Sequence, residues 1–196
     1  MLYNRGTKGS FGLWADQVGD DSYSWEKVLP FYERSVHLTP PNMDVRAANV
    51  SANYSASTLG TDEKGPVHLS YPAYAQPLSS YGPAAFAAAG IPPVEDFISG
   101  NLHGYNYFAF TIDPETGLRS SAETSFLSPA MRSGRLFVYQ WSTAQKILFD
   151  DDKRATGVEV SLQGLPPYKL SARKEVILSA GAVSHSLRTP KARAKA

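Results

Sequence analysis

The run Glu-Val-Ile-Leu-Ser-Ala-Gly at residues 175–181 restricts the fold of this chain more than any other feature. Its apolar residues are consecutive rather than alternating, which is typical of a strand buried on both faces in a parallel sheet. No βαβ unit that could supply neighbouring parallel strands is visible upstream. A strand entering a Gly-Ala turn usually continues into a helix or a phosphate-binding loop, but here a short basic tail follows at 184–196. We therefore expect the chain to be a piece of a larger fold.

The segment before this run predicts an antiparallel meander. Acidic residues at 150–152 and a Gly-Leu-Pro-Pro stretch at 164–167 provide turns between β-rich runs. The predicted strands are LFVYQW (136–141), AQKILF (144–149), TGVEVSL (156–162) and YKLSA (168–172).

Helical spacing of apolar residues predicts short helices in the first half of the chain. One covers 11–18, and a second runs from a Ser24 cap to about His37, where Pro30 should kink the helix or delay its start. The remaining predictions are a half-exposed strand over 67–71 and helices over 84–89 and 121–131. The fold class is therefore α+β.

Composition excludes several classes of function. The chain has 196 residues, of which 42% are hydrophobic and 19% charged, so one ordinary domain or two small ones are expected. A net charge of +1 gives no reason to expect nucleic acid or a membrane as a partner. Cysteine is absent, which excludes disulfides, thiolate metal sites and a cysteine nucleophile.

Two neighbouring sequons point toward the secretory pathway. Asn49 and Asn53 each begin an Asn-x-Ser acceptor for N-glycosylation, in a segment that is predicted to be loop. The first ten residues lack the apolar core of a signal peptide. We therefore expect secretion, if it occurs, in a full-length relative rather than from a leader in this sequence.

Motifs predict no catalytic and no metal-binding residue. The histidines, His37, His68, His103 and His185, are scattered without metal-ligand spacing and are interpreted as surface or hydrogen-bonded side chains. Glu159 and Glu175 form no acid–base pair, and Ser179 lacks the glycine that precedes a nucleophilic serine. Neither a GxGxxG nor a GxxxxGKS phosphate loop occurs.

Several blocks of residues do resemble a known family. Residues 1–35 are similar to the segment that follows the flavin-contacting Asn-Gly in glucose–methanol–choline (GMC) oxidoreductases, and 113–160 resemble that family's middle segment. EVILSAGAV resembles the strand that returns to the FAD domain, so the resemblance covers about residues 1–183, mostly with fungal aryl-alcohol and glucose oxidase-like members. The residues of the first block in the family's order and spacing are Met1, Tyr3, Arg5, Gly6, Trp14, Gly19, Asp20, Trp25, Pro30 and Tyr32.

The resemblance implies an α+β fragment with an antiparallel meander, peripheral helices and one strand of the FAD-domain sheet. It implies FAD as cofactor and a small-molecule alcohol, oxidised by hydride transfer to the flavin, as substrate of the full-length relative. The implied segments are a flavin-covering part (1–65), a substrate-side part (66–134), the meander with the return strand (135–183) and a divergent basic tail (184–196).

The resemblance also implies cofactor contacts. Met1, Leu2, Tyr3 and Asn4 match the stretch that passes the isoalloxazine ring. Ala144 matches a position whose backbone meets the adenine, and Ala180, Gly181 and Ala182 match a turn that approaches the dinucleotide. Without the family, Ala144 would be interpreted as an inward-facing strand residue and Gly181 as an ordinary turn.

Three departures from the family leave alternatives open. The family's GxGxxG would precede Met1, its catalytic histidine would follow Ala196, and its pattern is lost after Ala182, as a truncated or misjoined reading frame would produce. The chain is thus interpreted as part of a flavoenzyme or as a non-catalytic remnant whose residues 176–178 expose apolar surface. A relative with non-redox chemistry, such as cyclisation or cyanohydrin cleavage, is a further possibility.

Overall fold

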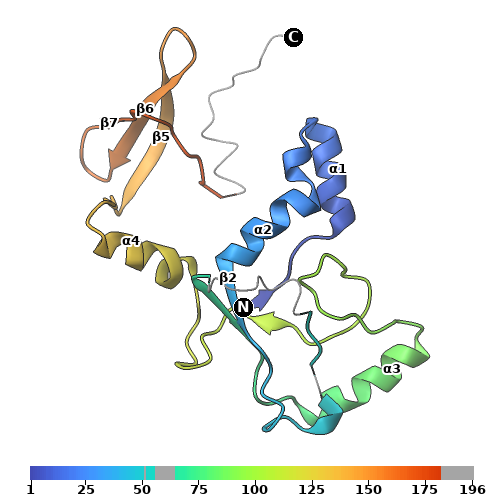
Figure 1. Cartoon of the computed structure of the whole chain (residues 1–196). Coiled ribbons are helices and arrows are strands. Elements are labelled where there is room, and N and C mark those ends of the chain that lie inside the picture. The colour runs from blue at the N-terminus through green and yellow to red at the C-terminus, as the bar shows by residue number, and fades with distance from the viewer. Residues whose placement is uncertain (51, 56–64, 182–196) are drawn as a thin grey trace. The chain divides into compact units, whose positions relative to one another are not determined.

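The computed structural model describes residues 1–50, 52–55 and 65–181 and divides the chain into two compact units, Met1–Leu136 and Phe137–Ala196 (Figure 1). The first unit contains the helices α1 (Lys8–Val18), α2 (Trp25–Ser35), α3 (Gly82–Ala88) and α4 (Ser128–Arg132), and the strands β1 (Leu2–Tyr3), β2 (Val36–Thr39), β3 (Val67–Ser70) and β4 (Ala109–Phe110). Short helical turns precede α2, α3 and α4 at Asp21–Tyr23, Pro77–Tyr81 and Glu123–Leu127, and another lies at Ala48–Val50. The second unit contains β5 (Ser142–Phe149), β6 (Ala155–Leu162) and β7 (Tyr168–Ser171).

Local signals start and end α1, whereas the predicted Ser24 cap of α2 makes no side-chain capping hydrogen bond. The Thr7 hydroxyl accepts the N–H of Ser10 at the start of α1, and Gly19 ends the helix in the left-handed conformation at φ +67°. α2 begins at Trp25, so Pro30 lies inside the helix and does not delay its start. The Phe11 ring lies 5.6 Å from that of Trp25, which joins α1 to α2. The predicted helices at 84–89 and 121–131 are present as α3 and as the turn that leads into α4.

The first unit is built on a mixed sheet with the strand order β1-β4-β3-β2 (Figure 1). β4 pairs antiparallel with β1 and with β3, and β2 pairs parallel with β3 in the register Val36↔Val67. The prediction of a helix to about His37 is wrong, because α2 ends at Ser35. From Val36 the chain alternates between buried and half-buried residues, and it is extended because it pairs with β3.

One apolar cluster lies against this sheet. Leu69 of β3 is fully buried, and it packs with Val36 and Leu38 of β2, Ala109 of β4 and the ring of Tyr71. At roughly 25 cal/mol for each Å² of apolar surface removed from water, such side chains supply most of the local stability. The cluster holds together strands that come from distant parts of the sequence.

The second unit is an antiparallel meander in the order β5-β6-β7. It agrees with the predicted strands at 144–149, 156–162 and 168–172. The predicted strand at 136–141 is wrong: this segment pairs with no described strand, Phe137 and Trp141 are 79% and 89% exposed, and Trp141 has a positive φ of 60°. A positive φ in a bulky residue breaks the extended conformation that a strand requires.

The apolar run at 175–178 is likewise outside any strand of the described chain. The remnant interpretation expects residues 176–178 to expose apolar surface. Ile177 is 76% exposed, whereas Val176 and Leu178 are half-buried. A strand needs a neighbouring ladder for its backbone groups, and no described segment provides one here. Among the described helices, none has the length and apolar character required to cross a membrane.

Candidate functional site

The segment predicted to pass the flavin ring lies at the edge of the first sheet. β1 pairs with β4 on one side, and the Met1 carbonyl accepts the N–H of Thr111 at 2.9 Å. Met1 and Leu2 are 56% and 58% exposed, and Asn4 is exposed, whereas Tyr3 packs against the apolar cluster. Of the four residues predicted from the resemblance, Met1, Leu2 and Asn4 are therefore accessible at this edge, whereas Tyr3 faces the core.

Arg5 ties this edge to a distant loop. It is 1% exposed, its N–H donates to the Phe97 carbonyl at 3.1 Å, and its guanidinium donates to the Ile98 carbonyl at 3.2 Å. The guanidinium also lies 5.3 Å from the centre of the Tyr32 ring on α2, a cation–π contact. Arg5 thus fixes the position of the residues that directly precede it.

The loop that binds Arg5 is organised by Asp96, which is 1% exposed. One carboxylate oxygen accepts the N–H groups of Ile98 at 2.9 Å and Ser99 at 2.7 Å, and the other accepts the N–H of Ser55 at 2.7 Å. Sequence reasoning quoted Arg5 as a family residue but gave it no role, and it missed Asp96 entirely. The available signal was an aspartate at the start of a Gly- and Asn-rich loop, where Asp commonly accepts N–H groups two and three residues later.

The other predicted cofactor residues belong to the second unit. Ala144 pairs with Val160, and the pairing register shifts directly after it, before Lys146. Ala144 is exposed, so its interpretation as an inward-facing residue is wrong. Ala180 and Gly181 are also exposed; Gly181 has φ +82°, and a Cβ built on it would meet no atom within 4 Å. Ala182 lies outside the described residues, and these cofactor contacts stay predictions.

Two of the histidines, which are far apart in the sequence, are neighbours in the first sheet. His37 and His68 are register partners in β2 and β3 with ring centres 5.6 Å apart, and His68 Nδ1 lies 4.0 Å from Asp113 Oδ1. The N–H of Glu115 is the main cause that keeps the pKa of Asp113 below its ordinary value, and the Thr116 hydroxyl and His68 add to this effect. Within the described chain no group of three or more metal-ligating side chains occurs. His103 is exposed, and His185 lies outside the described residues.

The two sequon asparagines are both exposed. Ser55, which completes the Asn53 sequon, is 4% exposed and donates its N–H to Asp96, whereas Ser51 of the first sequon lies outside the described residues. Glycosylation at Asn53 would therefore have to precede folding around Ser55. Use of either sequon stays a prediction.

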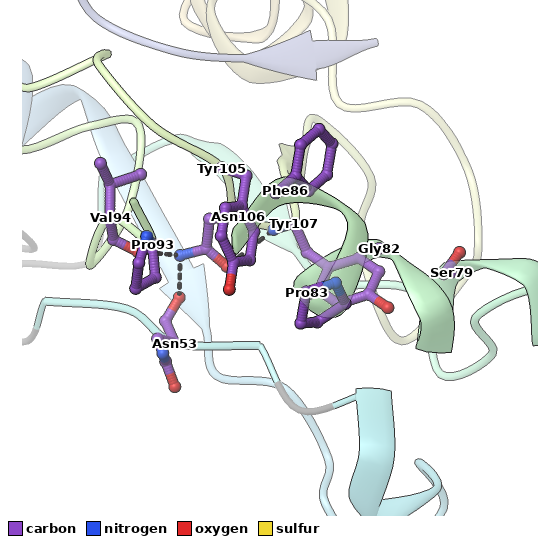
Figure 2. A pocket seen from close by; sticks show the side chains of 10 residues that line it. All are labelled: Asn53, Ser79, Gly82, Pro83, Phe86, Pro93, Val94, Tyr105, Asn106 and Tyr107. Atoms are coloured by element: carbon purple, nitrogen blue, oxygen red, sulfur yellow. Dashed lines mark hydrogen bonds between the residues drawn. The ribbon is translucent and has the colours of Figure 1, made fainter. Parts of the chain in front are cut away.

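A pocket of about 360 Å³ opens between the Pro77–Tyr81 turn, α3 and the loop 93–107 (Figure 2). The rings of Phe86 and Tyr105 stack beside it with centres 4.9 Å apart and an interplanar angle of 20°. The side-chain amide of Asn106 donates to the carbonyls of Asn53 and Val94 at 3.1 and 3.0 Å. The sequence predicted no site in this region.

Comparisons with known proteins agree with this architecture. A sequence model of the GMC oxidoreductase family matches residues 1–190. Versicolorin B synthase of Aspergillus parasiticus is 44% identical over 182 residues, which are 92% of this chain and 28% of the relative. Patulin synthase of Penicillium expansum is 46% identical over 182 residues, 93% of this chain and 28% of that protein.

Solved structures also match nearly all of this chain over about a third of their own length. A FAD-dependent oxidoreductase from Chaetomium thermophilum matches with a TM-score of 0.86 and 30% identity, over 96% of this chain and 32% of that one. A fungal aryl-alcohol oxidase shares the fold, with a TM-score of 0.78 and 22% identity over 93% of this chain and 31% of its own.

The chain thus spans about 30% of the length of the proteins it matches. FAD, the cofactor predicted from the resemblance, is the cofactor that the family match and the FAD-dependent neighbour indicate. With a family match over nearly all of its length and an α+β fold shared with these enzymes, the chain belongs to the GMC oxidoreductase family.

Proposed function

We propose that the chain forms part of an FAD-dependent enzyme that oxidises the CH–OH group of a small alcohol. The observation that carries this proposal is the family match over residues 1–190, supported by the structural match at a TM-score of 0.86. In this proposal Met1, Leu2, Tyr3 and Asn4 lie along the isoalloxazine ring. The backbone of Ala144 then meets the adenine, and Ala180 and Gly181 belong to the turn that approaches the dinucleotide.

The described residues fit parts of such a cofactor. The exposed side chains of Met1 and Leu2 suit the apolar benzenoid part of the ring system, and the Asn4 amide suits its polar edge. The open space at Gly181 allows a ligand to approach the backbone closely. The sequence has no glycine-rich loop for the pyrophosphate, so binding by these 196 residues should be weak.

A bound flavin would supply a hydride acceptor. The contribution of the described residues is positional: Arg5 and Asp96 hold the edge strand, and its apolar side chains exclude water from one side of the ring. We assign no proton acceptor within the chain. The alternatives of a non-catalytic remnant and of a non-redox relative stay predictions; both relatives described above are named synthases.

Flavin fluorescence tests the assignment of Met1–Asn4. Titration of riboflavin with the 196-residue protein should quench the flavin emission in a saturable manner. Leu2→Asp, which places a charge on the proposed ring-facing edge, should weaken the interaction at least about fivefold, since an unpaired charge near an apolar surface is costly. The matched control is Leu13→Asp on α1, which alters a side chain that is 61% exposed, and it should bind like the unmodified protein.

Equal loss of binding in both variants, or no quenching by the unmodified protein, would contradict the assignment. A second measurement addresses the remnant interpretation: after incubation with FAD and desalting, we expect a colourless eluate. A retained visible flavin band would show that the chain holds the cofactor without a glycine-rich loop, and the remnant interpretation would then be wrong.

A further inference from the structure

We infer that the pocket beside α3 binds a neutral aromatic molecule that carries a hydroxyl or carbonyl group at its edge. The pocket lies entirely within the first unit, and its walls come from the Asn53 segment, α3 with the turn before it, and the loop 93–107 (Figure 2). The inference goes beyond the proposed function, because it does not depend on FAD or on turnover.

The size of the pocket suits a small organic molecule. Its volume of about 360 Å³ lies in the lower part of the range of roughly 300–1,000 Å³ that is typical of small-molecule sites. No residue that lines it carries a formal charge. A charged ligand would lose hydration in this pocket without gaining an ion pair, so the lining selects neutral molecules.

The aromatic character of the ligand follows from the Phe86–Tyr105 pair. The two rings already stack with centres 4.9 Å apart, yet Phe86 is still 40% exposed. Offset stacking of a further ring is favourable beyond the simple burial of apolar area. Pro83 and Pro93 add flat, rigid apolar surface to the same walls.

The walls are held in place before any ligand binds. Besides its bonds to Asn53 and Val94, the Asn106 amide donates to the Glu95 carbonyl at 2.6 Å, and its oxygen accepts the N–H of Tyr107 at 2.7 Å. Gly104 has φ +151°, and a Cβ at this position would overlap the Pro92 carbonyl oxygen. A rigid pocket binds more tightly because less ordering is required on association.

The polar edge of the ligand follows from the remaining lining residues. Five of the ten lining residues carry an amide or hydroxyl group, and the other five are apolar residues or glycine; the polar residues are Asn53, Ser79, Tyr105, Asn106 and Tyr107. Polar groups placed among apolar walls usually fix the orientation of a ligand. A hydroxyl or carbonyl substituent can pair with such groups, whereas an unsubstituted hydrocarbon would leave them desolvated.

Three probes of similar size test the ligand class on the 196-residue protein without FAD. They are 4-methoxyphenol, its saturated analogue 4-methoxycyclohexanol, and the anion 4-methoxybenzoate, each titrated by two-dimensional NMR. We expect saturable shifts of the Phe86, Tyr105 and Asn106 signals with 4-methoxyphenol, and at least about tenfold weaker binding of the other two. Equal binding of the saturated analogue or of the anion, or no shift at these residues with 4-methoxyphenol, would overturn the inference.

A pair of variants tests the aromatic wall directly. Phe86→Leu keeps an apolar side chain on α3 but removes the ring, and it should weaken 4-methoxyphenol binding about five- to tenfold, in line with the worth of an aromatic pair. Phe137→Leu makes the same change at a side chain outside the pocket that is 79% exposed, and its affinity should be unchanged. Unchanged affinity in Phe86→Leu, with the circular dichroism of both variants intact, would contradict the role of this ring.

Discussion

Asp96 accepts backbone N–H groups from its own loop and from Ser55, which is 41 residues away in the sequence. Its carboxylate therefore joins the Asn53–Ser55 segment to the loop that binds Arg5, and through Arg5 it reaches the edge strand β1. A buried acceptor of this kind acts on several elements at once, so its replacement should be felt well beyond its own loop.

We predict that Asp96→Asn lowers the free energy of unfolding by about 1–3 kcal/mol. The amide can keep one acceptor oxygen, but its NH2 group would then face the N–H of Ser55 or Ile98, and a buried donor would lose its partner. Urea denaturation followed by circular dichroism measures the change. Asp151→Asn, at an exposed position in the turn between β5 and β6, should stay within about 0.5 kcal/mol; equal stability of both variants would contradict the proposed role of Asp96.

Tyr71 carries the second prediction at this scale. Burial is the main cause that raises the pKa of its hydroxyl to about 12, and the Asp96 charge adds to the effect while Arg46 opposes it. Because the folded-state pKa lies above the unfolded value of about 10, stability from this group is complete below pH 10 and is lost as the pH rises toward 12. Tyr71→Phe should therefore show a smaller loss of stability between pH 10 and 12. A urea midpoint that falls equally in both proteins would count against this assignment.

At the scale of elements, local sequence signals were enough to predict helices and hairpins, but they did not predict the pairing of strands that are distant in the sequence. Apolar spacing predicted α1 and α2, an alanine-rich run predicted α3, and turn residues predicted the β5–β6–β7 meander. β2 was missed because Val36 continues the helical spacing of α2, while its partner Val67 is 31 positions away. The same limit applies to the site: Met1–Asn4 came from a sequence resemblance, whereas the pocket beside α3 exists only after residues 53, 86 and 105 meet.

The parallel pair β2–β3 yields a prediction of its own. Leu69 lies in β3 between β2 and β4 and is fully buried, so Leu69→Ala creates a cavity that three strands line. We expect a loss of about 2–5 kcal/mol in the free energy of unfolding. Leu165→Ala removes a leucine that is 59% exposed, and it should change stability by less than about 0.5 kcal/mol. If the two variants unfolded at the same urea concentration, the cluster around Leu69 would not be the core of the first unit.

At the scale of the whole molecule, the exposed apolar side chains differ in how they are distributed. In the first unit they are mostly separated in the sequence, as with Leu78 and Leu118, and isolated exposed residues of this kind are normal. At 136–141, by contrast, four apolar residues follow one another, Trp141 comes after a single glutamine, and all five are exposed. Contiguous apolar surface marks contact with something else or a tendency to associate. The matched relatives are about three times longer than this chain, so we propose that further protein surface covers this segment in them.

This argument predicts that the 196-residue protein self-associates. Sedimentation velocity should show a sedimentation coefficient that rises with protein concentration, because water is released when contiguous apolar surface is buried between copies. The triple variant Phe137→Ser, Val138→Ser, Trp141→Ser should remain monomeric over the same range. The matched control Leu13→Ser, Leu78→Ser, Leu118→Ser removes as many exposed apolar side chains, each between 61% and 78% exposed, from scattered positions and should associate like the unmodified protein. If the control abolished association equally, total apolar exposure rather than the segment at 136–141 would govern the behaviour of the chain.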